Sequence, residues 1–174
     1  MFNWKIVNEN YLSYLRDGIE PRIPNVNYGI DKFKPFFGNL FEHENFVYIT
    51  QISHPQHRHK TMKNSADFQK VYNSDDGRLL CVVNLNYMFP ISKMDLSNLK
   101  YGDIDKYRSF LNDDEKSKYI DLLRLEMNEL NNINLSEKAW KLYNMRNSYP
   151  DNPVSRRCFD FKLLEETCMK YTHI

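Results

Sequence analysis

The chain changes character near residue 110, and this change limits the folds it can adopt. Before that point, short runs of aromatic and β-branched residues alternate with turn residues, a pattern typical of strands. After it, "DDEKSKYIDLLRLEMNELNNI" (113–133) carries apolar residues three, four and seven positions apart, as in a helix with one buried face. These apolar residues are Tyr119, Ile120, Leu123, Met127, Leu130 and Ile133. Strands followed by helices predict an α+β fold.

Local signals place the remaining elements. A first strand is expected at 4–7, and a helix capped by Asn8 or Asn10 is expected to end at Gly18. An irregular loop with two prolines and a glycine covers 20–34. The runs 35–42 and 46–53 predict a hairpin, and 78–91 predicts one buried strand. Two further helices are expected, one capped by Ser136 and one over 159–171.

Composition restricts the class of protein. The 174 residues predict a single domain over 1–174, with 27% charged residues and a net charge of +1. Nucleic-acid binding would therefore need a local cluster of cations, because the total charge supplies no basic field. Three cysteines without a CxxC pair predict neither a disulfide framework nor a zinc ribbon, and they fit a reducing cytoplasm.

No membrane association is expected. The N-terminus "MFNWKIVNEN" turns polar too early for a signal peptide, and no apolar run approaches the roughly 20 residues of a membrane span. Cys81, Cys158 and Cys168 lie in apolar stretches and are expected to be buried, as are Trp4 and Trp140.

The segment "QISHPQHRHK" (51–60) carries the densest set of chemically useful side chains. Three interpretations are open. His54, His57 and His59 could bind a metal, although Arg58 and Lys60 alternate with them and would repel a cation. The segment could instead be a solvated basic loop. It could also perform phosphate chemistry without a metal.

The third interpretation has a specific chemistry. RNA can be cleaved by its own 2′-hydroxyl when one group removes the hydroxyl proton, another protonates the leaving 5′ oxygen, and cations stabilise the charged phosphorane. Histidine titrates near neutrality and suits either proton role. Nucleotide-binding P-loops, dinucleotide fingerprints, HExxH helices and GxSxG turns are all absent from the sequence.

The order of several segments resembles the ToxN/AbiQ family, the toxins of type III toxin–antitoxin systems. The family's tyrosine-containing first helix and its "P…Y…K-x-F-[IF]-G" stretch correspond here to Tyr11, Pro24, Tyr28 and Lys34 with "PFFG". Its "PL[ST]SPK"-like strand end corresponds to "QISHPQ", and its "N-[LI]-x-x-M-x-PI" stretch to "VNLNYMFPI". Its C-terminal helix resembles "CFDFKLLEETCMKY". The likeness extends from about Trp4 to Tyr171 and is weakest between Lys93 and Pro153.

The resemblance implies a cytoplasmic endoribonuclease that needs no metal and no cofactor. Its products would end in a 2′,3′-cyclic phosphate and a 5′-hydroxyl. It would cleave the precursor of a tandem-repeat antitoxin RNA, and also cellular mRNA and phage RNA, which causes abortive infection. The processed pseudoknot RNA would bind back, inhibit the toxin and build a larger protein–RNA assembly, whereas the protein alone would be monomeric. The family fold is a strongly bent antiparallel sheet that resembles an SH3-like barrel.

The resemblance also implies site residues. Tyr11, Tyr28 and Lys34 match the family's groove tyrosines and lysine, and Ser53 matches the first hydroxyl residue of its strand-end motif. Of these, we expect Tyr28, Lys34 and Ser53 to act in catalysis. Where the family has a second hydroxyl and a lysine, this chain has His54 and Gln56. We therefore expect His54 to be the acid or the base, although the residues do not say which. The RNA-binding residues are expected to be Tyr11, Gln56, His57, Arg58, His59, Lys60 and Lys63.

Three rival interpretations remain open. The chain could bind RNA without cleaving it. It could be a metal-dependent nuclease that uses His54, His57 and His59. It could also be a toxin that a protein antitoxin neutralises.

Overall fold

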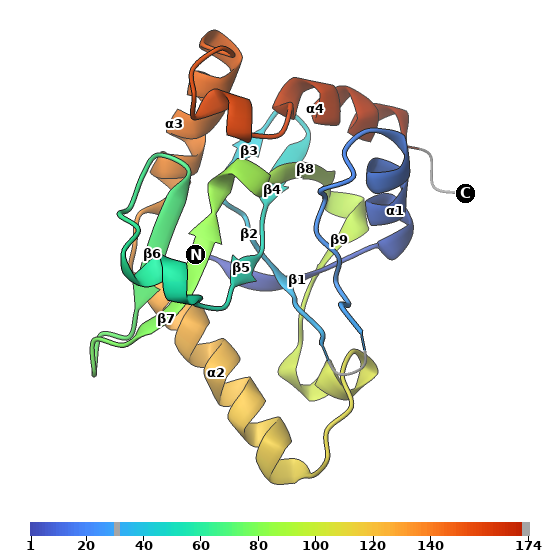
Figure 1. The fold of residues 1–174 in the computed structure, drawn as a ribbon. Helices are drawn as coiled ribbons and strands as arrows, with labels where there is room; N and C mark the ends of the chain where they lie inside the picture. The colour runs from blue at the N-terminus through green and yellow to red at the C-terminus, as the bar shows by residue number, and fades with distance from the viewer. Residues whose placement is uncertain (30–31, 172–174) are drawn as a thin grey trace.

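The computed structural model describes residues 1–29 and 32–171, so residues 30–31 of the predicted loop lie outside it. The first half of the chain is rich in strands, and the long helices follow (Figure 1). The strands are β1 (Asn3–Val7), β2 (Phe36–Gly38), β3 (Glu42–His43), β4 (Phe46–Ile49), β5 (Ile52–Ser53), β6 (Phe68–Tyr72), β7 (Leu79–Asn84), β8 (Phe89–Ser92) and β9 (Leu96–Asn98). The α-helices are α1 (Glu9–Gly18), α2 (Asp113–Asn131), α3 (Leu135–Ser148) and α4 (Phe161–Lys170).

All strand pairs are antiparallel, and they form three small sheets in the orders β2-β1-β9, β3-β4-β8 and β5-β7-β6. A bridge between Phe37 and Thr50 links the first sheet to the end of β4, with both backbone hydrogen bonds formed (2.8 and 3.2 Å). The chain then passes directly from β4 into β5 of the third sheet. The predicted α+β class is confirmed, with antiparallel strands and helices mostly in the C-terminal half.

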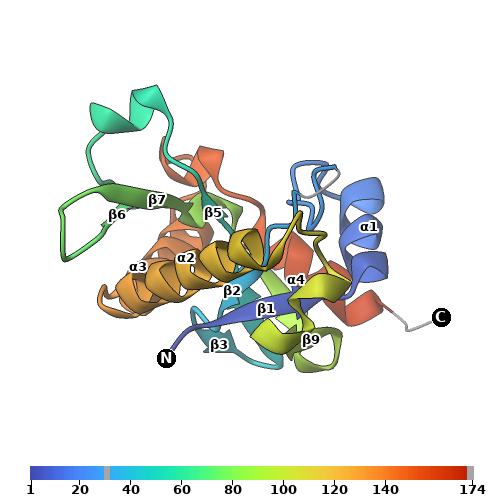
Figure 2. The same ribbon diagram turned by 90° about the horizontal axis from the view of Figure 1, so that it is seen from below.

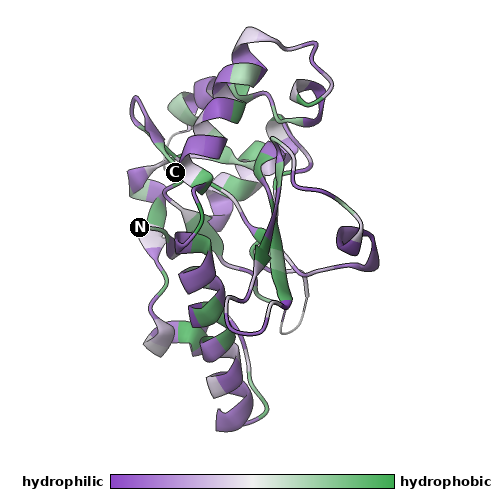
Figure 3. Cartoon of the chain, turned by 90° about the vertical axis from the view of Figure 1, so that its left-hand side faces the viewer, coloured by the Kyte–Doolittle hydropathy of each residue, from purple (hydrophilic) through white to green (hydrophobic). Residues whose placement is uncertain are grey.

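The helices cover the strands from different sides. α4 packs against β8, α3 packs against α4, and α2 contacts β6 and extends beyond the sheets (Figures 1 and 2). Hydrophobic colouring is concentrated on the strands, while the helices alternate hydrophobic and hydrophilic segments along their length (Figure 3). Among the helices described, none combines the length and the apolar character needed to cross a bilayer.

Several local predictions are confirmed. Asn8 caps α1 and accepts a hydrogen bond from the Asn10 amide, and Gly18 ends the helix. The hairpin forms between β3 and β4, where Glu44 adopts a positive φ of 52°. Trp4 and the three cysteines are buried, and the cysteines are free thiols.

Three local predictions are wrong. The segment 78–91 is not one strand, because a short 3-10 helix at Leu85–Tyr87 separates β7 from β8. The Leu85 amide donates to Asp67 O (2.8 Å) at this break, which turns the chain out of β7. The cap of α3 is Asn134 rather than Ser136, since the Asn134 side chain accepts from the Glu137 amide. Trp140 is 40% exposed and stacks on Tyr143 instead of entering the core.

Candidate active site

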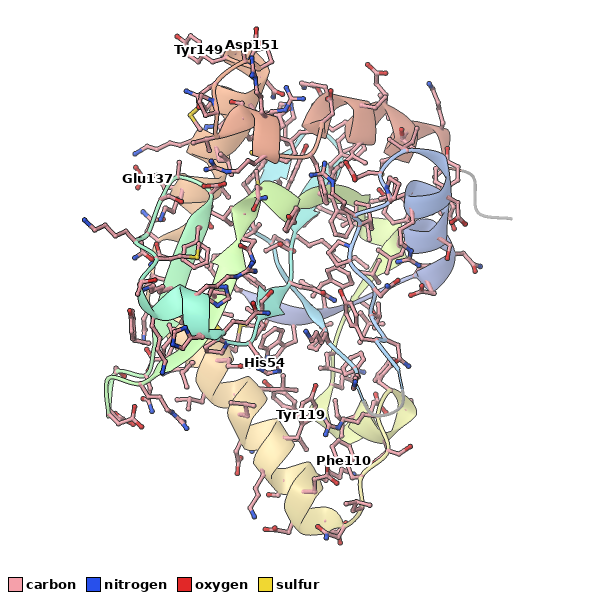
Figure 4. The ribbon with its side chains drawn as sticks, in the orientation of Figure 1. His54, Phe110, Tyr119, Glu137, Tyr149 and Asp151 are labelled. Atoms are coloured by element: carbon pink, nitrogen blue, oxygen red, sulfur yellow. The ribbon has the colours of Figure 1, made fainter. Side chains whose placement is uncertain are left out.

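A pocket of about 410 Å³ opens between the loop that precedes β2, the end of β5 and the inner face of α2. His54 and Tyr119 lie on its two sides, His54 directly after β5 and Tyr119 on α2 (Figure 4). Its size falls within the range of roughly 300–1,000 Å³ that is typical of ligand pockets. The lining combines aromatic side chains with a few polar ones, which are Tyr28, Lys32, Lys34, His54, Arg108, Tyr119 and Glu126.

Lys34 brings a cation into this pocket. Its backbone amide donates to Val26 O (2.8 Å), which folds the loop back on itself immediately before β2. Its Nζ lies 5.0 Å from the centre of the Tyr28 ring. Within the described residues Lys34 forms no ion pair, so its charge is free to meet an anionic ligand. A cation held over an aromatic face in a partly dry pocket is well placed to bind a phosphate.

Gln51 holds Tyr28 and Lys34 together, although no motif in the sequence marks it as a site residue. Its side chain is 8% exposed. The Gln51 amide nitrogen donates to Lys34 O (2.9 Å) and to Asn25 O (2.7 Å), and its oxygen accepts from the Tyr28 hydroxyl (3.1 Å). The amide group therefore fixes the loop to the β4–β5 junction by both of its polar atoms.

His54 follows β5 on the pocket side. Alternate residues of a strand point to opposite faces, so Ile52 and His54 face the pocket while Ser53 does not line it. Burial lowers the pKa of His54 below its ordinary 6.5, and the nearby Lys34 ammonium lowers it further. The imidazole is therefore neutral at neutral pH and can accept a proton. In the described chain His54 makes no hydrogen bond, so both ring nitrogens are open to a ligand.

Two predicted RNA-binding residues are buried, which is a correction. Tyr11 is completely buried, and its hydroxyl donates to Pro90 O (2.7 Å), so it is a core residue that joins α1 to β8. His59 is 3% exposed, its Nδ1 accepts from the Gln56 amide (3.0 Å), and its ring packs against Phe68. Both side chains have their polar atoms engaged by the protein and do not reach the surface.

The rest of the predicted RNA-binding segment is exposed. It forms a 3-10 helix, η1 (His57–Lys60), which projects away from the body of the molecule beyond β6 and β7 (Figure 2). The exposed residues are Gln56, His57, Arg58, Lys60 and Lys63.

The cations of this turn differ from most others on the surface. Many surface lysines and arginines are paired with a carboxylate, as in Lys93–Glu42, Lys118–Asp114 and Lys141–Glu137. Among the described residues, Arg58, Lys60 and Lys63 form no such pair, and no acidic residue lies between 51 and 63. A protein with a net charge of +1 thus still carries a locally basic turn.

The sequence patterns did not predict the residues on the α2 side of the pocket. Tyr119 donates its hydroxyl to Phe33 O (3.2 Å), which ties α2 to the loop that carries Lys34. The Arg108 guanidinium lies 4.4 Å from the centre of the Tyr119 ring and pairs with Glu115 (3.2 Å).

Glu126, on the same side of the pocket, is 2% exposed. One signal was present, because Glu126 is an acidic residue on the apolar face that contains Tyr119, Leu123 and Leu130.

The three-histidine metal site is not formed. No group of three histidine, cysteine or acidic side chains converges anywhere in residues 1–29 and 32–171. His54 faces the pocket, His57 lies on the exposed turn, and His59 is buried with its Nδ1 engaged.

Comparison with known proteins identifies the family of this chain. The family model described as "Toxin ToxN, type III toxin-antitoxin system" matches residues 4–169. The chain belongs to the ToxN toxin family. It is thus a toxin of the type III toxin–antitoxin class. No curated protein sequence matches the chain.

Solved structures resemble the whole chain at low sequence identity. One comes from a bacterial antiviral system regulated by a processed non-coding RNA (TM-score 0.79, 20% identity, 98% of this chain and 99% of the other). A second belongs to a type III system whose toxin is selectively inhibited by a non-coding RNA pseudoknot (0.76, 19%, 98% and 97%). A third is AbiQ, a lactococcal anti-phage endoribonuclease (0.76, 18%, 97% and 96%). The fold of the ToxN family is therefore shared along nearly the full length of these chains.

Proposed function

We propose that this ToxN-family toxin is an endoribonuclease that cleaves RNA by attack of the 2′-hydroxyl on the adjacent phosphate, without a metal ion. The observation that carries the proposal is the meeting of an unpaired Lys34, Tyr28 and a neutral His54 in one pocket. The anti-phage endoribonuclease among the similar structures supports RNA cleavage as the activity.

Each of the three residues has a role in the proposed reaction. The His54 imidazole accepts the 2′-hydroxyl proton while the 2′ oxygen bonds to phosphorus. Lys34 stabilises the negative charge that develops on the phosphoryl oxygens. The bond from phosphorus to the 5′ oxygen breaks, and the Tyr28 hydroxyl, whose pKa is raised by burial, leaves its hydrogen bond to Gln51 Oε1 and donates its proton to that oxygen. The products are a 2′,3′-cyclic phosphate and a 5′-hydroxyl.

The role that we propose for Ser53 differs from the roles of these three residues. It lies at the end of β5 next to His54, and its backbone pairs with Val82 of β7. Since Ser53 does not line the pocket, we propose that it orients the strand end rather than contacting the phosphate.

The proposed RNA partners follow from the family and from the basic turn. We propose that a tandem-repeat pseudoknot RNA is both the substrate and the inhibitor, and that cellular and phage RNAs are cleaved when it is absent. The inhibitory pseudoknot of a similar type III system supports this assignment. The exposed cations Arg58, Lys60 and Lys63 would contact RNA phosphates, which every RNA sequence presents.

The decisive experiment is cleavage of the repeat RNA encoded beside the gene, in excess EDTA, by wild type and by Lys34→Ala. Lys141→Ala, on the exposed surface of α3, is the matched control. Fragments ending in a 2′,3′-cyclic phosphate are expected with wild type and the control only. Bound but intact RNA would leave an RNA-binding module, and activity that needs added zinc or manganese would favour a metal-dependent nuclease.

A further inference from the structure

The helix side of the pocket contains two polar atoms for which the fold supplies no partner. Glu126 Oε1 and Arg108 Nε are both buried and form no hydrogen bond in the described chain. Both residues line the same pocket as Lys34. Buried polar groups without partners are rare, since each one costs about 1–3 kcal/mol, and those that persist commonly mark a ligand site.

Glu126 is the more unusual of the two. Only 2% of its surface is exposed, and it lies on the apolar face of α2. Burial raises its pKa to about 8. The carboxyl group is therefore mostly neutral at neutral pH, with one hydrogen-bond donor and one acceptor side by side.

Aromatic rings line the same pocket as these two residues. Trp4, Phe33 and Tyr119 line the pocket, and their polar atoms are already engaged. The Trp4 indole donates to Leu123 O (2.8 Å), and the Tyr119 hydroxyl donates to Phe33 O. These residues therefore present ring faces and edges to the pocket rather than hydrogen-bonding groups.

The best ligand for this arrangement is flat, apolar on its faces and polar at its edge. A nucleobase meets all three conditions, because proteins bind unstacked RNA bases by stacking on aromatic rings and by hydrogen bonds to the base edge. A phosphate would be disfavoured at Glu126 by the acidic group and by the apolar walls. Lys34, on the loop side of the same pocket, is the natural phosphate contact.

We propose that the helix side of this pocket is a nucleobase subsite, in which Glu126 and Arg108 hydrogen-bond the edge of one unstacked RNA base beside the phosphate that Lys34 holds. This inference rests on the proposed function, because it places the base next to the bond that is cleaved. It makes Glu126 a specificity-determining residue for the toxin.

The test measures base preference with and without Glu126. Binding of the four nucleoside 3′-monophosphates is followed by Trp4 fluorescence in a Trp140→Phe background, since Trp140 lies outside the pocket. In parallel, the bases around the cut are read from cleavage of a random single-stranded RNA pool. The variants are Glu126→Leu and Glu126→Gln, with Asp121→Asn on the exposed face of α2 as the control.

Wild type and Asp121→Asn are expected to prefer one base by at least about tenfold, and Glu126→Leu is expected to lose that preference. Glu126→Gln, whose amide keeps a donor and an acceptor at every pH, is expected to retain a preference that does not change between pH 6 and pH 9. It also serves as the second variant if Glu126→Leu does not fold. Unchanged preference in both Glu126 variants would overturn the subsite.

The outcome separates this inference from the proposed function. Cleavage with an unchanged base preference in both variants would remove the subsite and leave the ribonuclease. A wild-type protein that binds one nucleotide through Glu126 but cleaves no RNA would leave the subsite and remove the ribonuclease.

Discussion

At the scale of single residues, the site depends on a few short contacts around one loop. Gln51 uses both polar atoms of its amide to join Tyr28, Asn25 and Lys34. Burial and the Lys34 charge both keep the His54 imidazole neutral. The effect of burial and the effect of the Lys34 charge can be separated by substituting Lys34, which lies outside β5.

We predict that Lys34→Met raises the pKa of His54. The Lys34 ammonium disfavours the imidazolium, so its removal makes protonation easier. Because burial is the larger cause, the pKa is expected to stay below 6.5. NMR titration of the His54 ring measures this, with Lys118→Met as a control. An unchanged pKa would mean that Lys34 and His54 do not interact.

We predict that Gln51→Leu weakens both the fold and catalysis. It leaves the carbonyls of Asn25 and Lys34 without a donor, which costs about 1–3 kcal/mol of unfolding free energy. Urea denaturation and cleavage of repeat RNA measure the two effects. Gln51→Glu keeps the acceptor for Tyr28 but loses both donors, so it should resemble Gln51→Leu. Wild-type cleavage by both variants would show that Gln51 does not position the site.

At the scale of elements, α2 and η1 contribute to the site in different ways. α2 forms one wall of the pocket through Tyr119 and Glu126, and is tied to the loop by the Tyr119 hydroxyl. η1 carries its cations on an exposed turn that projects from the body of the molecule (Figure 2). α2 therefore contributes packed and buried side chains to the site, whereas η1 contributes positive charge exposed to solvent.

We predict that Glu126 makes the protein less stable as the pH rises. Its pKa is about 8 when folded and close to 4.5 when unfolded, so the folded chain holds a proton that the unfolded chain has released between these values. The unfolding free energy therefore falls with rising pH in this window, by up to about 1.4 kcal/mol per pH unit from this residue. Urea denaturation at pH 5.5 and 7.5 should show this slope in wild type and Asp121→Asn. Glu126→Leu should lose it; a wild-type slope in that variant would contradict the prediction.

We predict that the triple variant Arg58→Ala/Lys60→Ala/Lys63→Ala binds RNA with a smaller salt dependence. Each phosphate contact to single-stranded RNA contributes about 0.7 to the slope of log K against log salt, so the slope should fall by roughly 2. Fluorescence anisotropy over a salt series with the Lys34→Ala background, which prevents cleavage, gives the measurement. A triple variant of Lys106, Lys118 and Lys141, which are paired with carboxylates, is the control. Equal slopes would place the RNA elsewhere.

At the scale of the whole molecule, one hydrophobic cluster joins the strands to the helices. Glu165 of α4 is buried within it and accepts hydrogen bonds from Tyr48 of β4 and Tyr143 of α3, both at 2.9 Å. The same carboxylate pairs with Lys162 (2.9 Å). β4, α3 and α4 thus meet at one buried carboxylate.

We predict that the protein alone is a monomer and that repeat RNA converts it into a larger assembly. The cations of the exposed basic turn do not line the pocket, so an RNA bound by the turn of one molecule can reach the pocket of another. Size-exclusion chromatography with light scattering of Lys34→Ala, with and without RNA, measures the mass of each species. A complex of one protein and one repeat would argue against a bridged assembly.

Much of this protein follows from its sequence alone. Apolar periodicity determined α2 and the hairpin, because helices and strands bury their residues with different repeats. The order of short motifs indicated the family and placed Tyr28, Lys34 and His54 in one site. These signals are local, or they depend only on the order of segments.

Only the tertiary structure decided which side chains share a surface. Tyr11 and His59 are residue types that commonly contact RNA, yet both are buried: the Tyr11 hydroxyl donates to Pro90 O, and His59 Nδ1 accepts from the Gln56 amide. The sequence around Gln51 and Glu126 does not reveal that they belong to the site, because the residues around them lie in other elements of the chain. Burial and long-range hydrogen bonds depend on how distant segments pack, and no local pattern contains that information.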